Sequence, residues 1–325
     1  MVTNALKDLQ SIDLSSIDSE DSTFRISTQT EVQELAGAIQ ELGLMHPPIL
    51  KRLDTGYRIV SGFRRIAACR QIGWAKVPAF ILNSGTPGGT CTLYAIADNS
   101  LQRPLNLIEI SRSLNLLSGY FKEEKLQLKY ASLLGLSEHR AHIEKIEKLT
   151  HLPEPIQNGI LADAISLAVA LDLAEFEPEA AVALAELFER LQIGLNKQRQ
   201  IILLVKEIAM REDEGVDNLL NAEAVREISD SDELDRVQKS NQLLNYLYQR
   251  RYPTIARYKK EFETQVKALK LGKDMALVPP RDFEGTTYTL TLRFDSHSKL
   301  VDHQAKLDRI VRRNELKEFF NGKID

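Results

Sequence analysis

The sequence predicts a mostly helical α+β protein: a small α/β N-terminal domain, an all-helical middle domain and a small C-terminal strand–helix unit. Residues 28–82 combine short β-rich runs with stretches of helical spacing. From about Leu93 to Ala209 the helical spacing continues almost without a break. Near the C-terminus an alternating run, 287–294, precedes an amphipathic stretch at about 298–320. Because strands repeat every two residues and helices every 3.6, these patterns set the fold class.

Length and composition indicate an ordinary globular protein of several domains. The chain has 325 residues, enough for two or three separate cores. It is 43% hydrophobic and 27% charged, and it shows neither an apolar run of membrane-spanning length nor a secretory signal. Cys69 and Cys91 are too few for a disulfide framework or a zinc site. We therefore expect a reduced protein in the cytoplasm.

The charge is distributed in blocks, although the net charge is only −4. Residues 212–235 hold ten acids against one base, and residues 236–273 hold ten bases against two acids. Local blocks of charge affect which partners a protein binds more than its net charge does. We expect an acidic linker or a solvated helix, followed by a basic helix that could contact phosphates. The predicted segments are a flexible tail, an N-terminal domain, a helical domain, the linker and the C-terminal region, at residues 1–26, 27–104, 105–210, 211–235 and 236–325.

The N-terminal domain shows a regular alternation of helices and strands. Thr28 and Glu31 fit a capping box, and Gly43 suits the end of the helix that follows. Strands are expected at 47–52, 57–60 and 77–82, with a helix at about 64–72 between the last two.

The junction RIVSGFRRIAACR (58–70) is the strongest local candidate for a site. Gly62 stands between a strand and a helix, where backbone amides can face an anion. Arg64 and Arg65 follow in the first helical turn, where the helix dipole favours acids instead. A bound phosphate or carboxylate would explain two arginines there. The alternative is a solvated pair, or one arginine bound to a nearby acid.

Three blocks in order resemble the N-terminal domain of ParB-type partition proteins, which shares its small fold with sulfiredoxin. They are GLMHPPIL (43–50), YRIVSGFRRIAACRQIGWAKVPAFIL (57–82) and ADNSLQRPLNLIE (97–109). The resemblance implies a pocket that binds CTP with Mg²⁺, and Asp98 and Asn99 would be the metal ligands. The implied nucleotide-binding residues are His46, Gly62, Arg64, Arg65, Asp98 and Asn99.

The blocks depart from the family pattern at several polar positions. His46 replaces a Gln, Phe63 replaces the Glu of Gly-Glu-Arg-Arg, and Asp98 replaces a Glu. The family's arginine is also shifted, because Gln102 holds its place and Arg103 comes next. A phenyl ring can neither bind a metal nor act as a base. We therefore predict nucleotide binding with weak or absent CTP hydrolysis. Sulfiredoxin chemistry is excluded, since Phe63 stands where that enzyme has its cysteine.

Residues 126–153 have the pattern of a helix-turn-helix. Gly135 ends a first helix, and Ser137 is a suitable N-cap for a second one. The resemblance continues here and implies binding of double-stranded DNA. The alternative is an αα-hairpin in a helical bundle, because residues 122–154 hold six bases and six acids. The predicted DNA-binding residues are Ser137, His139, Arg140, His142, Lys145 and Lys148.

These features predict a DNA-binding protein of plasmid or chromosome partition, or of related transcriptional regulation, associated with the nucleoid or a plasmid. The resemblance implies a partition ATPase as a partner and no membrane. The C-terminal strand and helix could pair across a two-fold axis and give a homodimer, or could pack on the preceding basic helix. One alternative function is a ParB-like nuclease or nucleotide hydrolase. Another is an adaptor that does not touch DNA.

Overall fold

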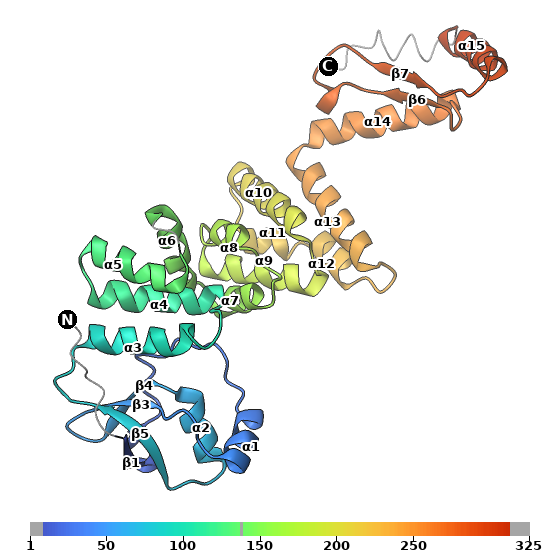
Figure 1. Cartoon of the computed structure of the whole chain (residues 1–325). Coiled ribbons are helices and arrows are strands. Elements are labelled where there is room, and N and C mark those ends of the chain that lie inside the picture. Colours follow the sequence, from blue (N-terminus) through green and yellow to red (C-terminus); the bar gives the residue numbers. More distant parts are fainter. Residues whose placement is uncertain (1–8, 137–138, 313–325) are drawn as a thin grey trace. The chain divides into compact units, whose positions relative to one another are not determined.

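The structure is a computed structural model that describes residues 9–136 and 139–312 (Figure 1). The chain divides into two compact units, residues 1–199 and 200–325, and the division falls within helix α10 (Leu195–Glu212). The sequence placed a boundary after residue 210 instead, and the domain limits within each unit remain predictions. Among the described residues, no helix has the length and apolarity to span a membrane.

A five-stranded mixed sheet forms the N-terminal part of the first unit, with strand order β1-β5-β3-β4-β2. β3 and β4 form an antiparallel hairpin, and β5 lies parallel to β3. At the two edges, β1 runs antiparallel to β5 and β2 runs parallel to β4. The strands are β1 (Leu9–Asp13), β2 (Ile17–Asp18), β3 (Ile49–Arg52), β4 (Tyr57–Ser61) and β5 (Lys76–Leu82).

Helices cover both faces of this sheet (Figure 1). α1 (Gln33–Leu42) and α2 (Phe63–Gln71) lie on one face, and α3 (Gly88–Ser100) lies on the other. Successive residues of a strand point to opposite faces, so Ile59 packs in the core under α1 and α2, while Val60 packs in the core under α3. The expected α/β unit, with its three strands and two helices, is confirmed.

The prediction of a flexible tail up to residue 26 is wrong from residue 9 on. β1 and β2 pair into the sheet, and Leu14, Ile17 and Ile26 are buried. Arg70 of α2 donates hydrogen bonds to the carbonyl oxygens of Leu14 at 2.9 Å and Ile17 at 2.7 Å. The sequence showed no strand because five and two residues are too few for a readable period, and the order comes from pairing with distant strands.

Six further helices complete the first unit before α10. α4 begins with a capping box, in which the side chains of Asn106 and Glu109 bond each other's backbone amides. α5 and α6 are separated by the predicted turn at Gly135. The helices are α4 (Leu107–Tyr120), α5 (Glu124–Ala131), α6 (Arg140–Glu147), α7 (Glu154–Leu161), α8 (Leu167–Leu173) and α9 (Pro178–Leu191).

The second unit consists of helices and a two-stranded sheet. β6 pairs antiparallel with β7, and residues of both strands pack with Leu269, Leu271 and Ile310 in one apolar cluster. The elements are α11 (Val216–Leu220), α12 (Glu223–Asp230), α13 (Arg236–Arg251), α14 (Pro253–Leu269), β6 (Met275–Val278), β7 (Thr289–Leu292) and α15 (His297–Val311). The predicted strand is present, and the final helix predicted at about 298–320 is present as far as Val311, the rest of it lying outside the described residues. The strand β6 was not predicted.

The expected acidic linker, 211–235, is also folded. It contains α11 and α12, which bury Leu219 and Val225. High charge hid these helices, since each buries only one or two apolar side chains.

The acidic and basic blocks neutralise each other in part. Arg250 forms ion pairs with Glu212 at 2.7 Å and with Glu214, and Arg251 pairs with Glu207 at 2.6 Å. A hydrogen bond from Arg250 holds the pKa of Glu212 below its usual range. With the pair between Arg257 and Glu261 at 3.9 Å, at least three of the ten bases expected to face phosphates therefore face carboxylates of the same chain.

We predict that Gly62→Ala lowers the free energy of unfolding of the N-terminal domain by about 1–3 kcal/mol, the usual cost of a strained backbone. Gly62 has φ of 95°, and a Cβ there would lie 2.7 Å from Cβ of Pro48. Urea denaturation followed by the fluorescence of Trp74, the only tryptophan, reports on this domain.

Gly37→Ala in α1 is the matched control. Nothing lies within 4 Å of a Cβ at this position, so the change should raise stability by about 0.5–1 kcal/mol. An unchanged midpoint for Gly62→Ala would show that the turn does not need its left-handed conformation.

Candidate functional site

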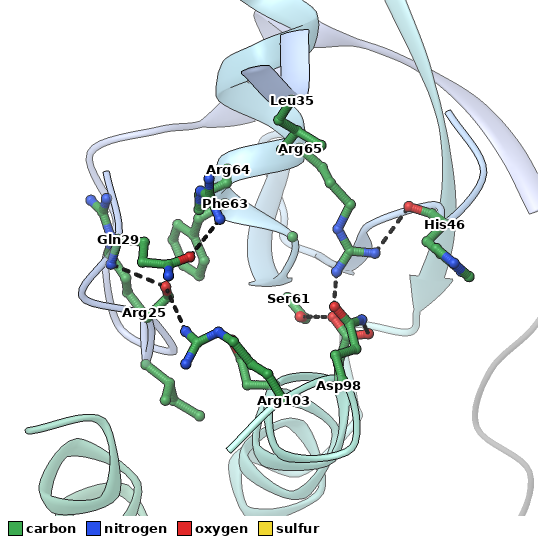
Figure 2. A pocket seen from close by; sticks show the side chains of 15 residues that line it. Arg25, Gln29, Leu35, His46, Ser61, Phe63, Arg64, Arg65, Asp98 and Arg103 are labelled. Carbon is green, nitrogen blue, oxygen red and sulfur yellow. Dashed lines mark hydrogen bonds and ion pairs between the residues drawn. The ribbon is translucent and has the colours of Figure 1, made fainter. Parts of the chain in front are cut away.

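The turn between β4 and α2 opens into a cavity of about 350 Å³ (Figure 2). Gly62 provides the left-handed turn, so α2 starts directly after the strand and its first amides lie at the cavity wall. The structure brings all six predicted nucleotide-binding residues to this wall, although they come from three separate blocks of sequence. They are His46, Gly62, Arg64, Arg65, Asp98 and Asn99.

Arg64 connects the start of α2 to the segment before α1. Its Nη1 donates to Oε1 of Gln29 at 2.6 Å, and its Nε and Nη2 donate to the carbonyl oxygen of Glu31 at 3.0 and 2.7 Å. The guanidinium thus closes one side of the cavity (Figure 2). A ligand phosphate at Arg64 would share or replace these bonds.

Arg65 connects α2 to the opposite wall. Its Nη1 donates to the carbonyl oxygens of His46 at 2.9 Å and Pro47 at 3.3 Å, and its Nη2 forms an ion pair with Asp98 of α3. The Asp98 carboxylate also accepts hydrogen bonds from the Ser61 hydroxyl and from Nε2 of Gln102 at 3.0 Å. The sequence left two alternatives to a bound anion, namely a solvated pair of arginines or one arginine bound to a nearby acid. The structure shows the second of these for Arg65.

The cavity has lining residues that the sequence reasoning missed. Arg25 lies over the ring of Phe63, with 5.8 Å between its Cζ and the ring centroid. Ser61, Gln102 and Arg103 also line the wall. Arg25 was missed because it falls in the segment expected to be a tail. Ser61 could have been found, since it precedes Gly62 directly.

The predicted magnesium site does not fit the arrangement of its donors. Asp98 is the only acidic residue that lines the cavity within the described part of the chain, and its oxygens already accept three hydrogen bonds. Asn99 donates its side-chain amide to the carbonyl oxygen of Ala95 within α3. Over residues 9–136 and 139–312 there is no group of three His, Cys, Asp or Glu side chains placed to hold a metal ion.

A buried carboxylate lies behind the cavity wall. The side chain of Glu109 is fully buried and forms a two-pronged ion pair with Arg103, at 2.6 and 2.7 Å. It also accepts hydrogen bonds from the backbone amides of Thr28 at 3.0 Å and Asn106 at 3.2 Å. The capping box predicted at Thr28 is therefore wrong: this residue bonds Glu109 across the fold, and α1 starts at Gln33.

The segment predicted to be a helix-turn-helix contains α5, a 3₁₀ turn (Ser132–Leu134) and α6, an arrangement that also fits the αα-hairpin. Ile143 and Ile146 of α6 are buried, as expected. His139 is the N-cap of α6, whereas Ser137, the predicted N-cap, lies outside the described residues. The other predicted DNA-binding residues are all exposed on this segment: His139, Arg140, His142, Lys145 and Lys148.

Helix α4 holds the C-terminal end of α6. The Ser111 hydroxyl donates to the carbonyl oxygen of Glu147 at 3.0 Å, and Nδ2 of Asn115 donates to the same oxygen at 2.7 Å. Asn115 also bonds Oγ1 of Thr150 at 2.8 Å. These bonds satisfy carbonyl groups that a helix end leaves free, and they fix which face of α6 is exposed.

Comparison with known proteins agrees with this architecture. Residues 2–96 match the family model described as the ParB N-terminal domain. A probable chromosome-partitioning protein ParB of Vibrio cholerae is 26% identical over 53% of this chain and 57% of its own length. One from Rickettsia typhi is 30% identical over 42% of this chain and 45% of its own. A nucleoid occlusion protein of Halalkalibacterium halodurans is 28% identical over 42% of this chain and 46% of its own length.

Solved structures give a weaker likeness. A truncated ParB of Caulobacter crescentus complexed with CTP-gamma-S is 23% identical, with a TM-score of 0.27 over 55% of this chain and 98% of that one. The same protein complexed to the centromeric parS site is 20% identical, with a TM-score of 0.34 over 58% of this chain and 96% of that one. The chain spans about half the length of the curated relatives it matches.

The N-terminal sheet, its cavity and the matching family model define a ParB-like N-terminal domain, and a series of helices that includes α5 and α6 follows it. Over these parts the chain is similar to ParB-type partition proteins.

We predict that Glu109→Gln lowers the free energy of unfolding at neutral pH by about 2–4 kcal/mol, because it leaves Arg103 without its buried partner. Burial alone would raise the pKa of Glu109, but hydrogen bonds from Arg103, Thr28 and Asn106 outweigh it and hold the pKa below the usual 4.5. As the pH falls through about 4.5, the unfolded chain takes up a proton here before the folded one does. This contribution to stability is therefore present above that pH and is lost as the pH falls through the folded-state value.

Urea denaturation at a series of pH values, followed by Trp74 fluorescence, measures the loss of stability at neutral pH and its dependence on pH. In Glu109→Gln the free energy of unfolding should fall less steeply as the pH is lowered below about 4.5. Glu144→Gln serves as a control, since Glu144 pairs with Arg140 in an exposed ion pair and should change stability by less than about 0.5 kcal/mol. Equal effects of the two changes would contradict a special role for Glu109.

Proposed function

We propose that this protein binds double-stranded DNA through α5 and α6 and binds CTP in the cavity between α2 and α3, in plasmid or chromosome partition or in related transcriptional regulation. The observation that carries the proposal is the cavity itself. Three distant blocks of sequence meet there, and two arginines and the first turn of a helix line its wall. The names of the relatives, chromosome-partitioning and nucleoid occlusion proteins, agree with a role on DNA.

The cavity suits the polyphosphate of a nucleotide. Backbone amides at the start of α2 are free of helical partners and favour an anion. Arg64 and Arg65 present planar donors that match phosphate oxygens. Mg²⁺ at Asp98 and Asn99 was expected from the sequence, and the bonds that Asp98 already makes argue against it.

Hydrolysis is expected to be weak or absent. Phe63 presents an aromatic ring at the cavity where the family pattern has a carboxylate, so this position can neither orient water nor bind a metal. The alternative function, a nuclease or nucleotide hydrolase, requires clustered carboxylates. No observation within the described residues favours it.

DNA binding is supported by the exposed polar face of α6 and by its attachment to α4. Arg140 pairs with Glu144 at 2.6 Å in the free protein, and that pair would open for a base contact. Association with nucleoid or plasmid DNA follows from this proposal. A homodimer and a partition ATPase partner are proposed from the family alone, because β7 finds its strand partner in β6 and the C-terminal cluster forms within one chain.

We predict that the protein binds CTP in calorimetry and that Arg64→Ala weakens the binding about tenfold or more, as expected for loss of a charge-assisted hydrogen bond. Arg52→Ala is the control. Arg52 also lies over an aromatic ring, Tyr57, at 5.9 Å, but it is outside the cavity wall. Absence of heat with CTP, ATP, GTP and UTP would contradict a nucleotide site.

A second prediction concerns DNA, with sites selected from a random library and binding measured by fluorescence anisotropy. Arg140→Ala should reduce discrimination between selected and random sequence by about 1–3 kcal/mol, the value of a base contact. Lys148→Ala should weaken both alike and reduce the salt slope by about one, as for a phosphate contact.

Lys306→Ala, an exposed change in the second unit, should leave both quantities unchanged. Selection that yields no enriched sequence, with no effect of Arg140→Ala, would favour the αα-hairpin reading of α5 and α6.

A further inference from the structure

The ion pair between Arg65 and Asp98 lies at the centre of the cavity wall (Figure 2). Both side chains are largely buried, with exposed fractions of 15% for Arg65 and 22% for Asp98. Three donors converge on the Asp98 carboxylate: the Ser61 hydroxyl, Nη2 of Arg65 and Nε2 of Gln102. An ordinary carboxylate that binds a metal keeps an oxygen free for it, and this one is already occupied on both oxygens.

The surroundings of the pair supply cations and no second free carboxylate. Arg25, Arg64 and Arg103 line the same cavity as Arg65. Glu109, which pairs with the lining residue Arg103, is fully buried and also accepts hydrogen bonds from two backbone amides. Phe63 presents a ring and no oxygen. Mg²⁺ is usually held by one or two carboxylates together with substrate phosphates and waters, and the one carboxylate that lines this wall, Asp98, is already engaged by three donors.

A phosphate can replace the Asp98 carboxylate as the ion-pair partner of Arg65 and accept the same charge-assisted hydrogen bonds. Guanidinium groups bind carboxylates and phosphates with the same planar geometry. A metal ion, in contrast, would have to draw Asp98 away from Arg65 and leave that guanidinium partly buried without a counter-ion. Exchange of one anion for another is therefore the easier change at this wall.

We infer that Asp98 is an internal counter-ion of Arg65 that competes with the nucleotide phosphates, and that the cavity binds its nucleotide without a divalent cation. This inference rests on the proposed nucleotide binding and concerns how the site is filled. The competent state is the one in which Arg65 has left Asp98, so the apparent affinity is reduced by the fraction of molecules that hold the pair. Removal of the Asp98 charge should then strengthen binding, whereas removal of a metal ligand would abolish it.

The test is calorimetry with CTP on the full chain, with Mg²⁺ and with EDTA, for the wild type, Asp98→Asn and Asp21→Asn. Asparagine keeps the shape of Asp98 and can still accept from Ser61. Asp21 is the matched control, because it forms an ion pair with Arg58 in the same domain but does not line the cavity. Trp74 fluorescence during urea denaturation checks that each variant is folded.

We expect the wild type to bind CTP about equally well, within about threefold, in Mg²⁺ and in EDTA, since guanidinium groups carry the neutralising charge. Asp98→Asn should bind about three- to tenfold more tightly in both buffers, and Asp21→Asn should bind like the wild type.

Three results would overturn the inference. Binding that occurs only with Mg²⁺, or weaker binding by folded Asp98→Asn, makes Asp98 a metal ligand and leaves the proposed nucleotide function intact. Absence of CTP binding by the wild type in both buffers removes that function, and this inference falls with it. If Asp98→Asn does not fold, the comparison of the wild type in the two buffers still decides the question of the metal.

Discussion

The carboxylate of Glu109 is the point at which three segments of the first unit meet. It accepts bonds from Arg103 at the end of α3, from the amide of Thr28 before α1, and from the amide of Asn106 at the start of α4. An unpaired charge in a fully buried position would be costly, so none of the three segments can move away alone. Burial lowers the pKa of the nearby Arg112, and the charge of Arg25 lowers it further. The cations behind the cavity are thus crowded, and Glu109 balances part of their charge.

The cavity follows from the segments that this carboxylate and the two arginines of α2 hold. Arg64 fixes residues 29–31, and Arg65 fixes the loop at His46 and Pro47. The same guanidinium groups are the proposed phosphate ligands. In the structure both guanidinium groups are bonded to acceptors of the same chain.

Helix α4 contacts both the N-terminal domain and the proposed DNA-binding helix α6. Its first turn includes Glu109, and Ser111 and Asn115, two and six residues later, bond the end of α6. One helix therefore bonds both the segments around Glu109 and the end of α6. The basic block, residues 236–273, offers fewer unpaired charges to phosphates than its composition suggests, since Arg250 and Arg251 are paired with acids of the same chain.

The pattern of the sequence was sufficient to predict the elements with a clear period and six of the residues that line the cavity. The α/β unit, the turn at Gly62 and the two helices around Gly135 were all readable, because apolar spacing, glycine and capping residues act locally. Tertiary structure alone decided what pairs with those residues. β1, β2 and β6 have no period of their own and exist through partners distant in the chain. The partners of Arg65, Arg103 and Glu109 likewise come from other elements, and a one-dimensional pattern of charge cannot show which cation will meet which acid once the chain has closed on itself.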